Sequence, residues 1–120
     1  MKIAFNGVGE EVITFATADE TIENGAPVAF SAEGDGTVCA AEDNTESVLV
    51  GFAAGEARNG LLAVKIKGYC EYDFGEEISL GMHSVVPASS GIALSGEEDA
   101  QLRSIMVIKA NGDKAGFILM

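Results

Sequence analysis

Apolar and polar residues alternate through the middle of the chain. In segment 61–69 the large apolar residues take every second position and small or charged residues stand between them: Leu62, Val64 and Ile66 against Ala63, Lys65 and Lys67. A period of two residues is typical of a β-strand with one buried face. The apolar run 48–50 ends at Gly51, and the loop 53–60 that follows is rich in small and polar residues. We therefore expect two strands joined by a loop at the centre of the chain.

Short β-favouring runs recur along the whole chain. They are separated by turn sequences such as Asn-Gly and Gly-Asp-Gly, and they lie at 3–5, 12–15, 28–30, 37–40, 84–86, 92–94, 102–110 and 117–120. Residues 97–101 suggest one helical turn, and the continuous apolar residues 105–108 suggest a strand buried on both faces. The pattern predicts an all-β fold, a small β-barrel or β-clip-like domain with little helix.

The length of 120 residues fits one domain and is too short for two. We expect residues 1–20 to form an N-terminal hairpin or arm and residues 21–120 to form the body. Two parts of the chain also align with an offset of about 56 residues, which suggests a pseudo-duplicated fold. In that case two intertwined β units would share one core.

The formal net charge is −12, from 19 acidic and 7 basic residues. Nucleic-acid binding requires clustered Lys and Arg to replace phosphate counterions, and the chain has no such cluster. An anionic membrane surface is disfavoured for the same reason. The sequence has neither a transmembrane-length apolar run nor a signal-peptide pattern, so we expect a cytoplasmic protein unless it is assembled into a larger particle.

Residues that could carry catalysis are sparse. The single histidine, His83, lies in a loop-like segment, and no Gly-x-Ser-x-Gly nucleophile motif is present. The pair Gly7 and Gly9 lacks the third glycine of a dinucleotide fingerprint. Cys39 and Cys70 are not spaced as metal ligands; a disulfide between them is geometrically possible, but two free thiols are expected in a cytosolic chain. We predict no enzyme activity, no cofactor and no metal.

One segment offers aromatic residues for binding. In 69–74, Tyr72 and Phe74 alternate with acids and fall on one face, and Tyr69 precedes them. They form either an exposed aromatic strip or a set of rings that cap the core.

The order of motifs in the central segment resembles a known group of proteins. An apolar strand ending in Val50-Gly51-Phe52-Ala53 leads to Gly55-Glu56, then to the alternating strand 64–69, and then to Ile78-Ser79-Leu80-Gly81. This order resembles the small Gly/Ala-rich β proteins of tailed-phage and prophage structural gene clusters. Those proteins are similar to head decoration proteins, which have a β-clip or small-barrel fold. The resemblance covers roughly residues 22–94.

The resemblance implies a structural role without catalysis. Proteins of this kind bind the outer face of an assembled capsid, commonly as trimers, and brace neighbouring subunits of the major capsid protein. It implies that this chain is a homo-oligomer, with a trimer favoured, and that it resides on the virion. An N-terminal segment can add a strand to a capsid edge in this picture, with Ile3 and Phe5 as anchors beside Lys2. An ordinary hairpin is the alternative for the same residues, because Asn6-Gly7 follows them directly.

A second functional hypothesis stays open. A β-clip or barrel domain can also recognise a small sugar or peptide, and Tyr69, Tyr72 and Phe74 would then supply the contact.

Overall fold

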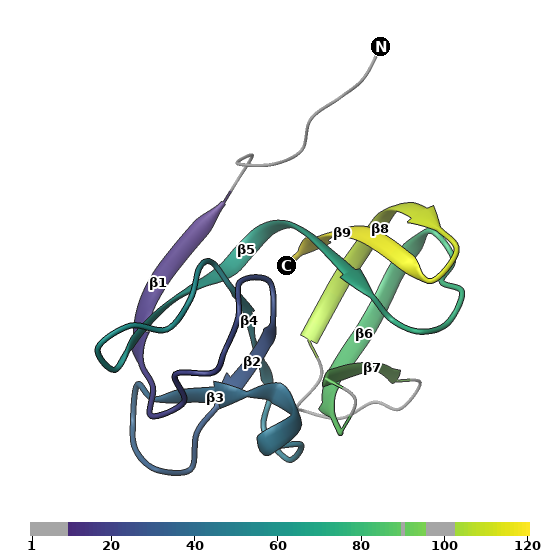
Figure 1. Cartoon of the computed structure of the whole chain (residues 1–120). Coiled ribbons are helices and arrows are strands. Elements are labelled where there is room, and N and C mark those ends of the chain that lie inside the picture. Colours follow the sequence, from purple (N-terminus) through teal and green to yellow (C-terminus); the bar gives the residue numbers. More distant parts are fainter. Residues whose placement is uncertain (1–9, 90, 96–102) are drawn as a thin grey trace.

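The computed structural model describes residues 10–89, 91–95 and 103–120, and these form nine β-strands and one short 3-10 helix (Figure 1). The prediction of an all-β fold is confirmed. The elements are β1 (Glu11–Ala16), β2 (Pro27–Phe30), β3 (Val38–Ala40), η1 (Ala41–Asp43), β4 (Leu49–Ala53), β5 (Leu61–Asp73), β6 (Gly81–Ala88), β7 (Gly91–Ser95), β8 (Arg103–Asn111) and β9 (Lys114–Leu119). Residues 3–5 and 97–101, for which we predict a strand and a helical turn, lie outside the described residues.

Strand β5 is the element that both halves of the molecule share. The sheet runs in the order β3-β2-β4-β5-β9-β8-β6-β7, and β1 also pairs with β5. The first part of β5 pairs with β1 and β4, whereas its second part, from Gly68 to Asp73, pairs with β9. Figure 1 shows β5 crossing the molecule between the two halves. The sheet curls on each side of this strand into a nearly closed antiparallel barrel.

The two halves repeat the same order of antiparallel pairing. The first half reads β3-β2-β4-β5 and the second reads β7-β6-β8-β9. The second part of β5 pairs with β9 in the way that β1 pairs with the first part of β5. This equivalence supports the internal repeat that the sequence suggests, and it covers five strands in each half.

The change of direction within β5 depends on Gly68. Its φ of +113° lies in a region that residues with a Cβ rarely adopt. A Cβ at this position would also meet the Cα of Glu10 at 3.0 Å. Glycine therefore lets β5 leave the first half of the sheet and enter the second without ending.

The buried side chains form two clusters, not the single shared core that we expect from the repeat. The first-half cluster consists of Ile22, Val28, Val38, Val50, Ala53, Ala57, Leu62 and Val64. The joint cluster draws on both halves and includes Leu49, Phe52, Cys70, Ile78, Val85, Ile92, Ile105, Val107, Phe117 and Leu119. Two clusters arise because β5 turns at Gly68: the first half encloses one set of apolar side chains, and the other set packs between the two halves.

The prediction that strand 105–108 is buried on both faces is wrong. Ile105 and Val107 are buried in the joint cluster, but Met106 between them is 37% exposed. A continuous apolar run does not distinguish a doubly covered strand from one with an exposed methionine on its outer face.

Arg103, at the start of β8, joins the two halves through backbone carbonyl groups. Its guanidinium donates to the carbonyl oxygens of Leu49 at 3.0 Å, Val50 at 2.7 Å and Met120 at 2.9 Å, and it also donates to Ile66. Burial lowers the pKa of Arg103, yet an arginine stays protonated at any physiological pH. One cation thus satisfies acceptors from β4, β5 and the C-terminus.

Candidate interaction surface

Strand β1 is exposed on both faces. Within it only Phe15 is partly covered, whereas Val12 and Ile13 are 46% and 45% exposed. β5 lies along one edge of β1, and no strand of the described residues pairs with the other edge between Val12 and Phe15. β1 is therefore an edge strand with little cover.

Two hydrogen bonds at the end of β1 show which of its residues point their backbone groups to this open edge. The N–H of Thr17 donates to the carbonyl of Gly60 beside β5 at 2.9 Å, while the N–H of Ala16 donates away from β5 to Gly36 at 3.0 Å. Successive residues of a strand point their backbone groups in opposite directions. The N–H and C=O groups of Val12 and Thr14 therefore point to the open edge.

Exposed apolar side chains continue from β1 onto its neighbours. Ile13 and Phe15 lie opposite Val64 and Leu62, so they share the side of the sheet that carries the first-half cluster. The ring of Phe15 packs edge-on against Phe30, with ring centroids 6.4 Å apart. Phe30 is itself 42% exposed. Val12 lies on the opposite face of the same strand. We call the open edge with these exposed apolar side chains the β1 strip (Val12, Ile13, Phe15 and Phe30).

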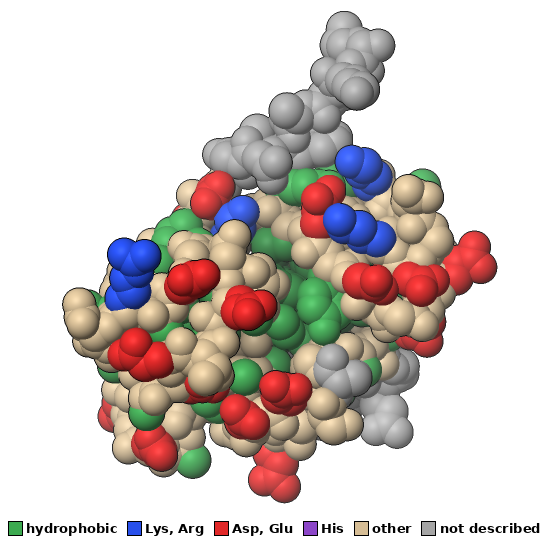
Figure 2. All heavy atoms as spheres, in the orientation of Figure 1, with side chains coloured by type: hydrophobic (Ala, Val, Ile, Leu, Met, Phe, Trp, Pro, Cys, Tyr) green, Lys and Arg blue, Asp and Glu red, His purple; other side chains and the backbone are tan. Residues whose placement is uncertain are grey.

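A groove of about 330 Å3 begins where β1 begins. Its lining residues come from the segment before β1, the loop before β2, the end of β4 and the bend of β5: Glu10, Asn24, Gly25, Phe52, Ala53, Ala54, Lys65, Tyr69, Cys70 and Glu71. Figure 2 shows hydrophobic side chains gathered in a hollow on this face, with acidic side chains around it. The groove can hold a short apolar or mixed segment.

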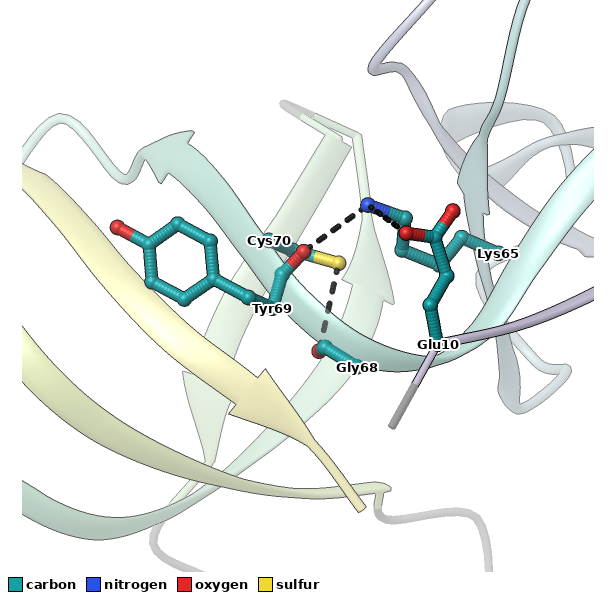
Figure 3. A network of polar contacts seen from close by, with 5 residues as sticks. All are labelled: Glu10, Lys65, Gly68, Tyr69 and Cys70. Carbon is teal, nitrogen blue, oxygen red and sulfur yellow. Dashed lines mark hydrogen bonds and ion pairs between the residues drawn. The ribbon is translucent and has the colours of Figure 1, made fainter. Parts of the chain in front are cut away.

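Lys65 holds the start of β1 against β5. Its ammonium group donates to the carbonyl of Tyr69 at 3.1 Å and lies 3.7 Å from the carboxylate of Glu10 (Figure 3). A partly exposed ion pair of this kind contributes about 0.2–1 kcal/mol to the free energy of unfolding. The contacts of Lys65 therefore contribute little to the stability of the fold. Their main effect is to hold Glu10, directly before β1, beside β5.

Tyr69 is buried, at 4% exposed, on the face of β5 opposite to Tyr72, and it lies over Gly116 of β9. A Cβ at Gly116 would meet the Tyr69 hydroxyl at 2.1 Å, so the ring occupies the space of an absent side chain. The hydroxyl donates to Glu71 at 2.9 Å. Burial and this hydrogen bond raise the pKa of Tyr69 to about 12, so its side chain is a neutral hydroxyl at physiological pH.

The predicted aromatic strip is divided between the two faces of β5. Tyr72 and Phe74 point to the joint cluster, where their rings lie 5.1 Å apart and pack with Phe52 and Phe117. Tyr69 points to the opposite face. The three rings therefore do not form one surface. Lys2, Ile3 and Phe5, the other predicted binding residues, lie outside the described residues.

The two cysteines are free thiols in different settings. Cys70 is buried beside the groove, and this burial raises the pKa of its thiol to about 11. Cys39 lines a separate hollow of about 550 Å3 with Asp19, Glu33 and Asp43. Burial and these carboxylates raise the pKa of Cys39. Both thiols are therefore protonated and weakly nucleophilic at neutral pH.

Groups that could carry other chemistry are already engaged or dispersed. The Nε2 atom of His83 lies 2.8 Å from the carbonyl oxygen of Ser79. Within the part of the chain that the structure describes, no three His, Cys, Asp or Glu side chains gather closely enough to hold a metal ion. In the same residues, no helix has the length and apolar character required to cross a lipid bilayer.

Residues 12–15 have the sequence pattern of a strand, but the pattern alone does not predict that one edge of this strand is open. A signal for it was present, since Val12 to Ala16 contains no charge and no proline, the residues that commonly protect an edge. Arg103 was missed because its acceptors are main-chain carbonyl groups, which leave no mark on the sequence.

No protein-family model matches the chain, and no curated protein matches it.

Proposed function

We propose that the protein is a non-enzymatic structural protein of a tailed phage or prophage. It binds the outer surface of the capsid as a homo-oligomer, with the major capsid protein as its partner, and stabilises the assembled head. The order of glycines and apolar strands from residue 22 to residue 94 is the basis of the resemblance, and the all-β fold is compatible with it.

The observation that carries the proposal is the exposure of β1, which directly follows residues 1–9 in the sequence. An extended segment that adds a strand to a partner's sheet binds through main-chain hydrogen bonds, and its apolar side chains add specificity. The residues that precede β1 contain Ile3 and Phe5 at alternate positions, with Lys2 beside them. A segment of this composition can extend onto a capsid subunit while the body stays on the outer surface.

The charge distribution supports an outer rather than an inner location. With a net charge of −12, the protein would be repelled by packaged DNA but not by the outer face of a shell. Within a homo-oligomer, individually weak contacts also become effective, because one bound subunit raises the effective concentration of the binding segments linked to it.

The test is binding to empty shells assembled from the major capsid protein of the same phage genome. We expect the full-length protein to sediment with the shells and the double variant Ile3→Asp/Phe5→Asp to lose at least about tenfold in affinity, equivalent to about 1.4 kcal/mol. Leu80→Asp, at an apolar residue that is 65% exposed far along the chain, is the matched control and should bind as the unaltered protein does. Failure of the unaltered protein to bind at any concentration would remove the proposal.

The alternative is a β domain that binds a sugar or peptide. The groove of about 330 Å3, with Lys65 and Glu71 on its walls and Phe52 in its lining, favours a small ligand with both polar and apolar parts. A thermal-shift screen with oligosaccharides and short peptides tests it. A ligand that stabilises the unaltered protein but not Lys65→Met would support the alternative, and the absence of any stabilising ligand would count against it.

A further inference from the structure

Strand β1 has the least protected edge in the described part of the sheet. β3, at one end of the strand order, has only three residues, and β7, at the other end, lies against η1. β1 has six residues, none of its side chains is fully buried, and it carries no charge from Val12 to Ala16. An uncovered, uncharged edge of this length pairs readily with another strand.

We infer that β1 pairs with β1 of a second copy of this chain, in an antiparallel arrangement around a two-fold axis. A two-fold contact requires a surface that is complementary to itself. An antiparallel strand edge meets this condition, because each outward-pointing residue offers both a donor and an acceptor.

The positions of the outward-pointing groups restrict the register. Val12 and Thr14 present their backbone groups to the open edge, so they must face outward-pointing residues of the second copy. Ala16 also points outward, but its N–H is already bound to Gly36 at 3.0 Å. The register that uses every remaining outward group sets Val12 opposite Thr14 of the second copy, and Thr14 opposite its Val12.

This register places Ile13 opposite Ile13 of the second copy, on the two-fold axis. Because the backbone groups of Ile13 point to β5, the two isoleucines form a pair without mutual hydrogen bonds, the closer type of antiparallel pair. Each Ile13 side chain, 45% exposed in the single chain, then packs on its counterpart beside Phe15. The paired residues Val12, Ile13 and Thr14 carry no charge, so the pairing brings no like charges face to face.

The two neighbouring registers, centred on Thr14 and on Val12, are less favourable. Setting Thr14 opposite Thr14 would place Val12 against Ala16, whose donor is occupied. Setting Val12 opposite Val12 would extend the pair across the irregularity between Glu11 and Val12. The Ile13-centred register avoids both obstacles.

Disulfide trapping in the purified full-length protein tests the inference without any capsid. In a Cys39→Ser background, Ile13→Cys should form a covalent dimer under mild oxidation at micromolar concentration, because opposed residues of this type have Cα atoms about 4.5 Å apart. Thr14→Cys and Val12→Cys probe the two other registers, and Ser89→Cys, at an exposed turn of the second half, reports random collision. We expect Ile13→Cys to cross-link at least about tenfold faster than the other three, a ratio equivalent to about 1.4 kcal/mol.

A faster reaction of Thr14→Cys or Val12→Cys would overturn the register, and equal rates for all four variants would overturn the pairing. The latter result is expected if residues 1–9 of the same chain cover β1 as a hairpin. Sedimentation of the charged variant Ile13→Lys gives a second readout that does not depend on oxidation: it should lower self-association while the circular dichroism spectrum stays unchanged. Unchanged self-association of Ile13→Lys would also contradict the pairing.

The experiments can refute the two-fold pairing and the proposed function independently of each other. The resemblance favours a trimer, whereas a β1 pair gives an even-numbered assembly, so the solution mass distinguishes two from three copies of the 12.4 kDa chain. A protein that binds shells but shows no cross-link through Ile13 would keep the function and lose the pairing. The opposite result would keep the pairing and lose the function.

Discussion

Replacing Arg103 tests whether one partly buried cation holds the two halves together. The variant Arg103→Met removes the guanidinium but keeps most of the apolar stem, so packing changes little. The carbonyl oxygens of Leu49, Val50 and Met120, and that of Ile66, then lose a charged donor.

The magnitude follows from the hydrogen bonds. A bond to a charged group contributes roughly 1.5–3 kcal/mol, and a buried carbonyl left without a partner costs about 1–3 kcal/mol. Some of these acceptors can recover a water molecule because Arg103 is only partly buried. Taking the lower limit of about 1 kcal/mol for each of the four acceptors, and allowing water to replace part of the loss, we expect a fall of about 3 kcal/mol in the free energy of unfolding. That corresponds to a fall in melting temperature on the order of 10 °C for a domain of this size.

Urea unfolding followed by circular dichroism measures the loss, at one fixed protein concentration because association would shift the transition. Arg103→Lys keeps the charge but cannot reproduce the planar fork of donors, so we expect about half the loss. Arg58→Met, at an exposed arginine, is the matched control and should stay within about 0.5 kcal/mol of the unaltered protein. If Arg103→Met also stayed within this limit, the bonds of Arg103 would merely replace bonds to water and the reasoning would be wrong.

Two further predictions concern Tyr69 and the residues around it. Gly116→Ala places a Cβ 2.1 Å from the Tyr69 hydroxyl, so it should destabilise the fold by about 1–3 kcal/mol in thermal unfolding. Gly34→Ala is the control and should have little effect, because the nearest atom to its Cβ would be 3.7 Å away. Equal stabilities of the two variants would contradict the packing of the Tyr69 ring. In a Tyr72→Phe background, phenolate absorbance should show Tyr69 titrating at about 12, and Glu71→Gln should lower this pKa because it removes the negative charge of the carboxylate. Since the folded pKa lies above the ordinary value of 10.0, the unfolded chain loses its proton first, and stability falls as the pH rises from 10.0 to about 12. An unchanged titration in Glu71→Gln would show that burial alone raises the pKa.

Much of the fold could be predicted from the period-two alternation. Leu62 and Val64, and later Cys70 and Tyr72, occupy even positions of β5 and face the two buried clusters. The alternation continues through Gly68, so residues 69–73, which the sequence analysis treats as a separate aromatic segment, belong to the same strand as residues 61–67. Glycine usually signals the end of a strand, and only the conformation of Gly68 shows that the chain bends here instead.

The candidate surface was less accessible to sequence reasoning. Tyr69, Tyr72 and Phe74 are neighbours in sequence, but an odd and an even position of one strand point to opposite faces. The exposure of β1 also depends on which strands lie beside it, and that information arises from long-range pairing. Local patterns indicate where a strand lies, but not whether its second edge is covered.

The internal repeat explains why β1 is exposed whereas its counterpart in the second half is covered. Its counterpart, the second part of β5, has the same place in the strand order but a different environment. Cys70 in that part is 7% exposed, and the rings of Phe52, Tyr72 and Phe117 pack over its inner face. These rings come from both halves, so the joint cluster covers one copy of the repeated strand and leaves the other uncovered. Val12, 46% exposed, lies on the uncovered copy. None of the described strands covers β1 in this way, and the proposed pairing with a second β1 would match the outward backbone groups of Val12 and Thr14.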